Sequence, residues 1–410
     1  MRTSAKEPVI YQLPKGMRLV CCQAPAEIEY FGVDTNVGSR DETSSHHGLA
    51  HFVEHTIFKG TLRRRVYHIN NRMEAVGGEL NAYTTKEETL VYTVAPRGNL
   101  ARSIELVADL LMNSQFPAAE LSREREVVRD EIDSYLDTPS ESVFDDFEDL
   151  FFAGSQLGHN ILGTTESLDS LTSEVCRSYL AENFHASRMT ACYLGREKPE
   201  NVLRKVQREF SDIRTEGAPL NRVRPAAVAP FNLRRDIDTH QSHTVLGASI
   251  PGIDDLRCDA IALVCNILGG PGMNSRLNLS LRERRGLVYA VDASTSIFSD
   301  CGLLNIYFGC DPADRDRCLE LVLKELRKIS MEPLTPRALA AAKKQFIGQL
   351  TVSSSSLEQT VLSAARAVTM TGRVRLRREV VDSIASITPD DVLAVASMLR
   401  PEVCSVLSLG

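Results

Sequence analysis

Stretches in which apolar and polar residues alternate are separated along the chain by longer helical stretches. The alternation typical of strands occurs at residues 11–20, 30–37 and 80–94, and the first of these contains a Pro-Lys-Gly turn. Helical periodicity follows at residues 101–113 and 120–136. Because strands and helices do not alternate regularly, the pattern predicts an α+β fold, with helices packed on one face of a largely antiparallel sheet.

The same order of segments recurs weakly in the second half of the chain. The stretch Phe31–Gly38 resembles Thr244–Gly252, and three further pairs of segments match in order, each pair roughly 215 residues apart. In the last pair Thr172 corresponds to Thr388, and each threonine is a suitable N-cap for the helix that follows. We interpret these matches as a duplication that produced two homologous domains of the same α+β architecture.

A segment without sustained periodicity separates the two copies. Residues 215–230 are rich in proline and alanine, as expected of a linker. We therefore expect a first domain at residues 1–214 and a second domain at residues 231–410. A chain of 410 residues has room for two domains of about 200 residues each.

Composition and charge narrow the class of protein. Hydrophobic residues make up 43% of the chain, and the net charge of −7 gives no support for nucleic-acid binding. No apolar run approaches the roughly 20 residues that cross a membrane, and no apolar secretory segment follows the N-terminus. The ten cysteines form no Cys-x-x-Cys pair, and several lie in apolar stretches, as reduced core residues do. We expect a cytoplasmic protein that binds neither membranes nor nucleic acid.

The most informative motif is His51-Phe-Val-Glu54-His55. On a helix, His51 and His55 share one face with their Cβ atoms about 5–6 Å apart, so both imidazoles can bind one divalent ion. The order H-x-x-E-H is the inverted form of a zinc-peptidase motif, in which a nearby carboxylate takes a proton from water. With 9 histidines and 54 acidic residues in the chain, about 0.03 chance occurrences are expected. The alternative is an ordinary amphipathic helix with surface histidines.

A zinc site of this kind also needs a third protein ligand. The helical stretch Ser122–Asp133 offers Glu124 and Glu131, which lie two turns apart on one face. Valines lie between them, and carboxylates beside an apolar stripe are unfavourable to bury unless a cation is near. The alternative is a surface helix whose carboxylates pair with the arginines of the same stretch.

At this point the chain resembles the pitrilysin-like metallopeptidases, which include mitochondrial processing peptidase and insulin-degrading enzyme. The segment Gly48–Thr61 is close to the site helix of that family, and the similarity covers essentially the whole chain. The resemblance implies one zinc ion with three protein ligands, His51, His55 and Glu131. The chain length resembles that of the short bacterial and mitochondrial members, which work as dimers of two-domain subunits.

The resemblance also assigns roles to two further acids. Glu54 falls at the position of the general base. Glu124 falls at the position of an acid that contacts the metal ligands without binding the metal itself. The second half has no equivalent site, because Asp259–Gly270 matches the site helix without any His or Glu, and Gln349 stands at the position matching Glu131. We therefore expect one zinc ion per chain, in the first domain.

A polar start marks the stretch Asn81–Tyr92, which the alternation predicts to be a strand. The resemblance implies an edge strand that binds the substrate backbone by strand addition, with Asn81 and Ala82 as substrate-binding residues. The alternative is a plain structural strand, which periodicity alone favours.

Arg282 and Tyr289 lie seven residues apart in the second half. Their sequence alone predicts a charged helix followed by a strand, with the tyrosine in a core or an interface. The resemblance implies instead that the arginine anchors the substrate backbone and that the tyrosine stabilises the oxyanion. In a chain of this length both would reach the site of a second subunit, so we expect a homodimer in which they act in trans.

The stretch Gly269-Gly-Pro-Gly272 is the remaining motif. It lacks the Gly-Lys-Ser/Thr that follows a phosphate-binding loop. It therefore predicts a flexible turn.

These observations favour a zinc endopeptidase that hydrolyses extended or unfolded peptides inside a dimeric clamshell chamber. One alternative is a catalytically silent scaffold or partner subunit of the same fold, against which the intact motif and Glu131 argue. The other is a simple metal-binding module, which leaves Arg282 and Tyr289 unexplained.

Overall fold

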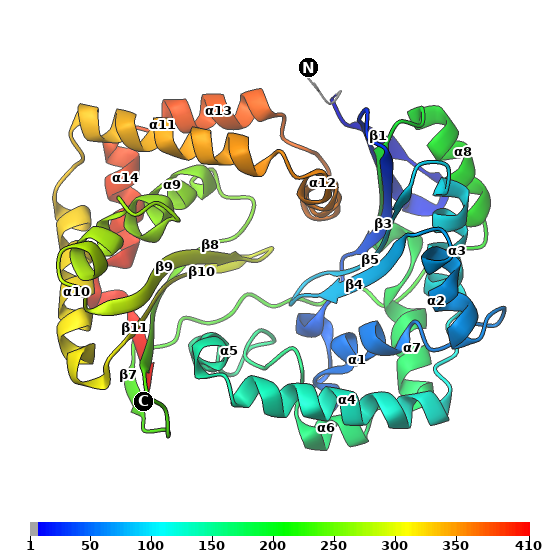
Figure 1. The fold of residues 1–410 in the computed structure, drawn as a ribbon, viewed down its shortest axis with the longest axis horizontal. Helices are drawn as coiled ribbons and strands as arrows, with labels where there is room; N and C mark the ends of the chain where they lie inside the picture. The colour runs from blue at the N-terminus through cyan, green and yellow to red at the C-terminus, as the bar shows by residue number, and fades with distance from the viewer. Residues whose placement is uncertain (1–6) are drawn as a thin grey trace. The chain divides into compact units, whose positions relative to one another are not determined.

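The computed structural model describes residues 7–410 and divides into two compact units, each with its own sheet (Figure 1). Unit 1 comprises the chain up to Asp133 together with His159–Val223 and Ser354–Arg375. Unit 2 comprises Ser134–Gly158, Arg224–Ser353 and Leu376–Gly410. Residues 1–6, on which the expectation about a secretory segment partly rests, lie outside the described residues.

Unit 1 contains a six-stranded sheet with the strand order β1-β2-β6-β3-β5-β4. Its strands are β1 (Val9–Gln12), β2 (Arg18–Gln23), β3 (Ile28–Thr35), β4 (Glu79–Thr84), β5 (Thr89–Pro96) and β6 (Met189–Gly195). All neighbouring strands are antiparallel except β2 and β6. β4 ends the sheet and pairs with β5 alone, so within residues 7–410 its outer edge has no strand partner.

Helices of the first half cover one face of this sheet and share its main apolar core. They are α1 (Leu49–Thr56), α2 (Val66–Glu74), α3 (Leu100–Asn113), α4 (Ala118–Leu136), α6 (Thr165–Asp169), α7 (Ser173–Asn183) and α8 (Pro199–Glu209). A helix from the second half, α12 (Leu357–Thr371), covers the other face, where Val361 and Val368 pack in a core with Val20 and Leu194. Figure 1 shows α3 and α12 on opposite sides of the sheet.

Unit 2 repeats this arrangement with a five-stranded sheet in the order β7-β11-β8-β10-β9. Its strands are β7 (Asn232–Arg235), β8 (Ser242–Pro251), β9 (Val288–Ile297), β10 (Cys301–Cys310) and β11 (Ser405–Leu409), and only β7 and β11 are parallel. One face packs against α9 (Cys258–Gly269), α10 (Arg315–Met331), α11 (Pro336–Ser353), α13 (Arg377–Ser386) and α14 (Pro389–Ala396). The other face packs against α5 (Pro139–Phe151), which comes from the first half of the chain.

The predicted α+β class with two homologous sheets is confirmed. The helical stretches predicted at 101–113 and 120–136 are α3 and α4. Thr172 and Thr388 both cap helices as expected, since each hydroxyl accepts a hydrogen bond from the backbone N–H three residues later. The periodicity did not predict that α5 and α12 each pack on the sheet of the other half of the chain. Each sheet has apolar residues on both faces, and one of these helices covers the second face of each sheet.

The single strand predicted over Asn81–Tyr92 is wrong, because this stretch belongs to the hairpin of β4 and β5. The chain turns at 85–88, where the Thr85 hydroxyl accepts hydrogen bonds from the backbone N–H groups of Glu87 and Glu88 at 3.3 and 3.1 Å. Threonine hydroxyls stabilise turns in this way. Alternation continues on both sides of the turn, so the periodicity did not reveal it.

Among residues 7–410, no helix combines the length and the apolar character needed to cross a membrane. All ten cysteines are free thiols, and nine of them are buried. Burial raises the pKa of the Cys22 thiol to about 11, so this thiol stays protonated near neutral pH.

The contribution of α5 to unit 2 can be measured at Phe147, a fully buried side chain whose ring lies 5.7 Å from that of Phe231. We expect Phe147→Ala to lower the free energy of unfolding by about 3–5 kcal/mol, because it leaves a cavity against the sheet. Urea denaturation followed by circular dichroism gives this value. Leu256→Ala, at a side chain that is 98% exposed, is the matched control, and an equal effect of both substitutions would contradict the packing role.

Candidate metal centre

Helix α1 carries the H-x-x-E-H motif and begins at a left-handed glycine. Gly48 has φ +90°, and a Cβ there would lie 2.6 Å from the backbone oxygen of Leu162. Leu49, Phe52 and Val53 of α1 lie in the core of unit 1. The apolar face of the helix is thereby fixed, and the face that carries both histidines is directed away from the core.

A buried carboxylate supports the start of this helix. The two carboxylate oxygens of Glu42 accept hydrogen bonds from the backbone N–H groups of Gly48 at 2.9 Å and Ala50 at 2.6 Å, and the His159 ring lies 3.3 Å from one of them. Burial raises the pKa of Glu42 to about 8, and the N–H groups of Ala50 and Gly48 act in the opposite direction. A carboxylate at this end of a helix also stabilises it through the helix dipole.

The three predicted ligand residues come together. The Nε2 atoms of His51 and His55 lie 3.7 and 3.5 Å from the same oxygen, Oε2 of Glu131 on α4. The two imidazole rings have centroids 4.5 Å apart, and one ligand atom from each of the three residues lies within 4.8 Å of the other two. Two helices therefore direct two ring nitrogens and one carboxylate oxygen toward a common point.

This donor set fits zinc. Ligands about 2.0–2.2 Å from a tetrahedral ion are themselves about 3.3–3.6 Å apart, which is close to the nitrogen–oxygen separations found between His51, His55 and Glu131. Two imidazoles and one carboxylate also leave one tetrahedral position for water. His51 is buried, and burial together with His55 lowers its pKa to about 3, which keeps the ring in the neutral form that binds metal.

Glu124 contacts the ring nitrogen of His55 that lies away from the other two candidate ligands. Its Oε1 atom lies 3.1 Å from Nδ1 of His55, and its Oε2 atom forms an ion pair with Nζ of Lys59 at 2.6 Å. A carboxylate on the second ring nitrogen fixes the tautomer of a metal-binding histidine and leaves Nε2 for the ion. His51 differs, because its buried Nδ1 has no hydrogen-bond partner among residues 7–410.

Glu54 lies beside the ligand residues and against the end of strand β4. Burial raises the pKa of its carboxyl group, while contacts with Thr84 and with His55 act in the opposite direction. Thr84 is the last residue of β4, so the candidate base and the open strand edge are neighbours in unit 1. Asn81 and Ala82 lie on this strand, paired with Tyr92 and Val91 of β5.

The other two predicted residues lie in unit 2. Arg282 is exposed in the π-helical segment η5 (Asn278–Glu283), and Tyr289 is 64% exposed on β9. Sequence reasoning missed three residues of the unit 1 site, namely Glu42, Lys59 and Thr84. Their contacts depend on how separate segments meet in the fold, so neither periodicity nor the motif pointed to them.

Two models of one peptidase family match most of the chain. Residues 19–165 match the family model described as insulinase (peptidase family M16), and residues 170–346 match the model described as the peptidase M16 inactive domain. A protein described as an uncharacterized zinc protease from Streptomyces coelicolor is 33% identical over 94% of this chain and 85% of its own length. A relative with the same description from Bacillus subtilis is 28% identical over 96% of this chain and 95% of its own length.

Solved structures share the fold at low sequence identity. The peptidase M16 inactive domain from Pseudomonas fluorescens aligns with a TM-score of 0.92 at 17% identity, over 98% of both chains. A protease from Helicobacter pylori aligns with a TM-score of 0.90 at 17% identity, over 98% of this chain and 99% of that one. The chain belongs to the pitrilysin-like M16 family of metallopeptidases. Both relatives are described as zinc proteases, which supports zinc as the metal that the His-His-Glu group would bind.

The role of Glu124 is testable through metal affinity. We expect Glu124→Ala to weaken zinc binding roughly 10- to 100-fold, because His55 loses the carboxylate that orients its ring. Competition with a chromophoric chelator measures the affinity. Glu126→Ala removes an exposed acid from the same helix and should leave zinc affinity unchanged, and a comparable loss in both variants would contradict the assignment.

Proposed function

We propose that this chain is a zinc-dependent endopeptidase that hydrolyses extended or unfolded peptides, with one zinc ion per chain. The observation that carries the proposal is the convergence of His51, His55 and Glu131 on one point, with the carboxyl of Glu54 beside them. Zinc held by these three residues would supply Lewis-acid chemistry, acidifying water and polarising the scissile carbonyl. Proton transfer and binding of the substrate would be carried out by side chains and backbone groups of the protein.

Glu54 is the proposed general base. Burial and the nearby Glu131 favour its protonated form, whereas Thr84 and His55 favour the carboxylate, an environment suited to a group that first accepts a proton and later donates it. In this scheme Glu54 takes the proton of the attacking water and then transfers it to the amine that leaves. Peptide-bond hydrolysis needs both transfers, and one carboxyl group can perform them in turn.

Strand β4 is the proposed binding site for the substrate backbone. Its outer edge has no strand partner among residues 7–410, and its last residue, Thr84, contacts Glu54. An extended peptide added along this edge would form main-chain hydrogen bonds with alternate residues of β4 around Asn81 and Ala82, with little dependence on its sequence. Such binding selects unfolded or extended substrates, because a folded protein offers few free strand segments.

We assign Arg282 and Tyr289 to the site of a partner subunit in a homodimeric clamshell. Both are polar, exposed and part of unit 2, whereas the ligand residues belong to unit 1. The guanidinium would hold the substrate backbone, and the phenol would donate a hydrogen bond to the developing oxyanion. Tyr289 carries a large exposed aromatic surface, which an enclosed chamber would shield.

The alternative is a silent scaffold subunit of the same fold. The family model described as an inactive domain matches residues 170–346, which lie beyond all three ligand residues. The first-half match spans His51, Glu54, His55 and Glu131, all of which are present in the chain. The complete ligand set therefore favours the active peptidase.

The direct test is cleavage of an unstructured, internally quenched peptide by the zinc-loaded protein. We expect chelator-sensitive cleavage that falls roughly 10²- to 10⁴-fold in Glu54→Gln while one zinc ion per chain is retained. Glu126→Gln is the matched control, and it should keep wild-type activity. Cleavage that survives both the chelator and Glu54→Gln, or no cleavage by a zinc-loaded wild-type chain, would refute the proposal.

Action in trans is tested by mixing two variants. In a mixed dimer of Glu54→Gln and Tyr289→Phe chains, one site receives Glu54 from one subunit and Tyr289 from the other. Random 1:1 mixing should then restore about a quarter of the wild-type activity. If the mixture is no more active than the two variant homodimers together, the tyrosine does not act across subunits.

A further inference from the structure

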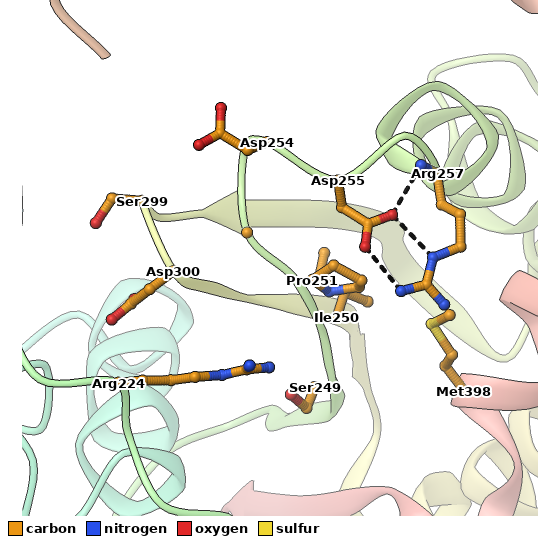
Figure 2. A pocket seen from close by; sticks show the side chains of 11 residues that line it. Arg224, Ser249, Ile250, Pro251, Asp254, Asp255, Arg257, Ser299, Asp300 and Met398 are labelled. Atoms are coloured by element: carbon orange, nitrogen blue, oxygen red, sulfur yellow. Dashed lines mark hydrogen bonds and ion pairs between the residues drawn. The ribbon is translucent and has the colours of Figure 1, made fainter. Parts of the chain in front are cut away.

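Two cavities of unit 2 differ in how their charges are balanced. The larger, of about 550 Å³, is lined by Arg224 and Arg257 and by three aspartates (Figure 2). Figure 2 shows the guanidinium of Arg257 bound to Asp255, with two side-chain hydrogen bonds of 2.8 Å, and this pairing lowers the pKa of Asp255 to about 2. Its acids outnumber its bases, so the larger cavity offers no uncompensated positive charge.

The smaller cavity, of about 180 Å³, is lined by a basic residue and by no acidic residue among residues 7–410. It lies between the end of α9, the segment 274–276 and three alanines of α11. Arg276 is the one charged residue that lines it. At about 30 Å³ per water molecule, its volume corresponds to roughly six waters, enough for a small ligand or for the end of a larger one.

The guanidinium of Arg276 forms no ion pair with an acidic residue of 7–410. The side chain is half-buried, and its Nη1 atom is buried without a hydrogen-bond partner in the part of the chain that the structure describes. None of the described acidic residues forms an ion pair with it. A buried cationic N–H group is stabilised by a hydrogen-bonded oxygen of opposite charge, so Nη1 of Arg276 suits the cavity to an anion.

Side chains with neutral hydrogen-bond donors line the same cavity as the arginine. Asn274 and Gln345 hydrogen-bond to each other through both amides, at 2.9 and 3.0 Å, which leaves one N–H on each amide free. Ser275 accepts a hydrogen bond from Asn278 at 2.9 Å, so its own hydroxyl proton is available. One guanidinium together with amide and hydroxyl donors is the chemistry that binds carboxylate or phosphate oxygens.

The glycine-rich turn makes room for this arrangement. A Cβ at Gly272 would lie 2.5 Å from Oδ1 of Asn274 and 2.7 Å from Nε2 of Gln345, and one at Gly270 would lie 2.2 Å from Oδ1 of Asn266. These three amide side chains line the cavity, so any larger residue at either glycine would displace them. The turn predicted from Gly269-Gly-Pro-Gly272 therefore lies directly behind side chains that line the cavity.

We propose that the cavity between α9 and α11 binds a small oxyanion, a carboxylate or a phosphate, with Arg276 as its counter-ion. Arg276 provides the charge, and Ser275, Asn274 and Gln345 supply the surrounding hydrogen-bond donors. The site uses residues of unit 2 alone and does not depend on the zinc site of unit 1.

The test is equilibrium binding of inorganic phosphate and, separately, of acetate to the zinc-loaded full chain, with chloride matching the ionic strength. We expect one anion per chain, beyond any held at zinc, that Arg276→Gln weakens at least tenfold, since the charge-assisted hydrogen bonds are lost. Arg284→Gln removes an exposed charge from the same region and should bind like wild type. Tighter binding of phosphate would mark a site for free phosphate, and tighter binding of acetate a site for carboxyl groups.

Arg276→Lys keeps the charge without the planar fork, and it should bind with intermediate affinity. This variant preserves the test if Arg276→Gln does not fold. Binding that is equal in wild type, Arg276→Gln and Arg276→Lys, or no binding of either anion above the chloride control, would overturn the proposal.

Discussion

The link from Lys59 through Glu124 to His55 is the interaction on which the metal centre depends. It ties the end of α1 to α4 and places an almost buried carboxylate between a cation and an imidazole. A carboxylate in this position is stable because both oxygens have partners. The consequence is geometric, since with Nδ1 of His55 engaged, Nε2 faces Nε2 of His51 and the carboxylate of Glu131.

The helix that carries the histidines is held from its other end as well. Glu42 accepts hydrogen bonds from the first N–H groups of α1, and the apolar side chains of the helix are locked in the core of unit 1. A rigid helix matters here because shifts of well under 1 Å in ligand position weaken a metal site. The contacts that stabilise the two ends of α1 therefore also position its two histidines.

Among the described residues of unit 2, no group of histidines, cysteines and acids is placed like the three candidate ligands of unit 1. α9 and α11 contact each other as parts of its core, yet α9 contains no histidine and Gln349 occupies the position in α11 that matches Glu131. Apolar side chains of both helices pack in the core of unit 2, and an uncharged amide stands where Glu131 stands in unit 1. At the edge of the same pair, Arg276 retains an unbalanced charge in a small cavity, which suggests that unit 2 acquired a binding chemistry of its own.

The fold class, α3 and α4, the helix caps at Thr172 and Thr388, and the H-x-x-E-H motif could all be predicted from local periodicity, residue type or a short motif. Glu131 was distinguished from Glu124 as the third ligand by the resemblance to a known family. The hairpin of β4 and β5, the covering of each sheet by a helix from the opposite half, and the positions of Glu42, Lys59 and Thr84 at the site emerged from the folded chain alone. The periodicity of an amphipathic helix shows that it has an apolar face, but it does not show which surface will pack against that face. A side-chain contact between distant segments does not alter the local periodicity, so it cannot be predicted from that pattern.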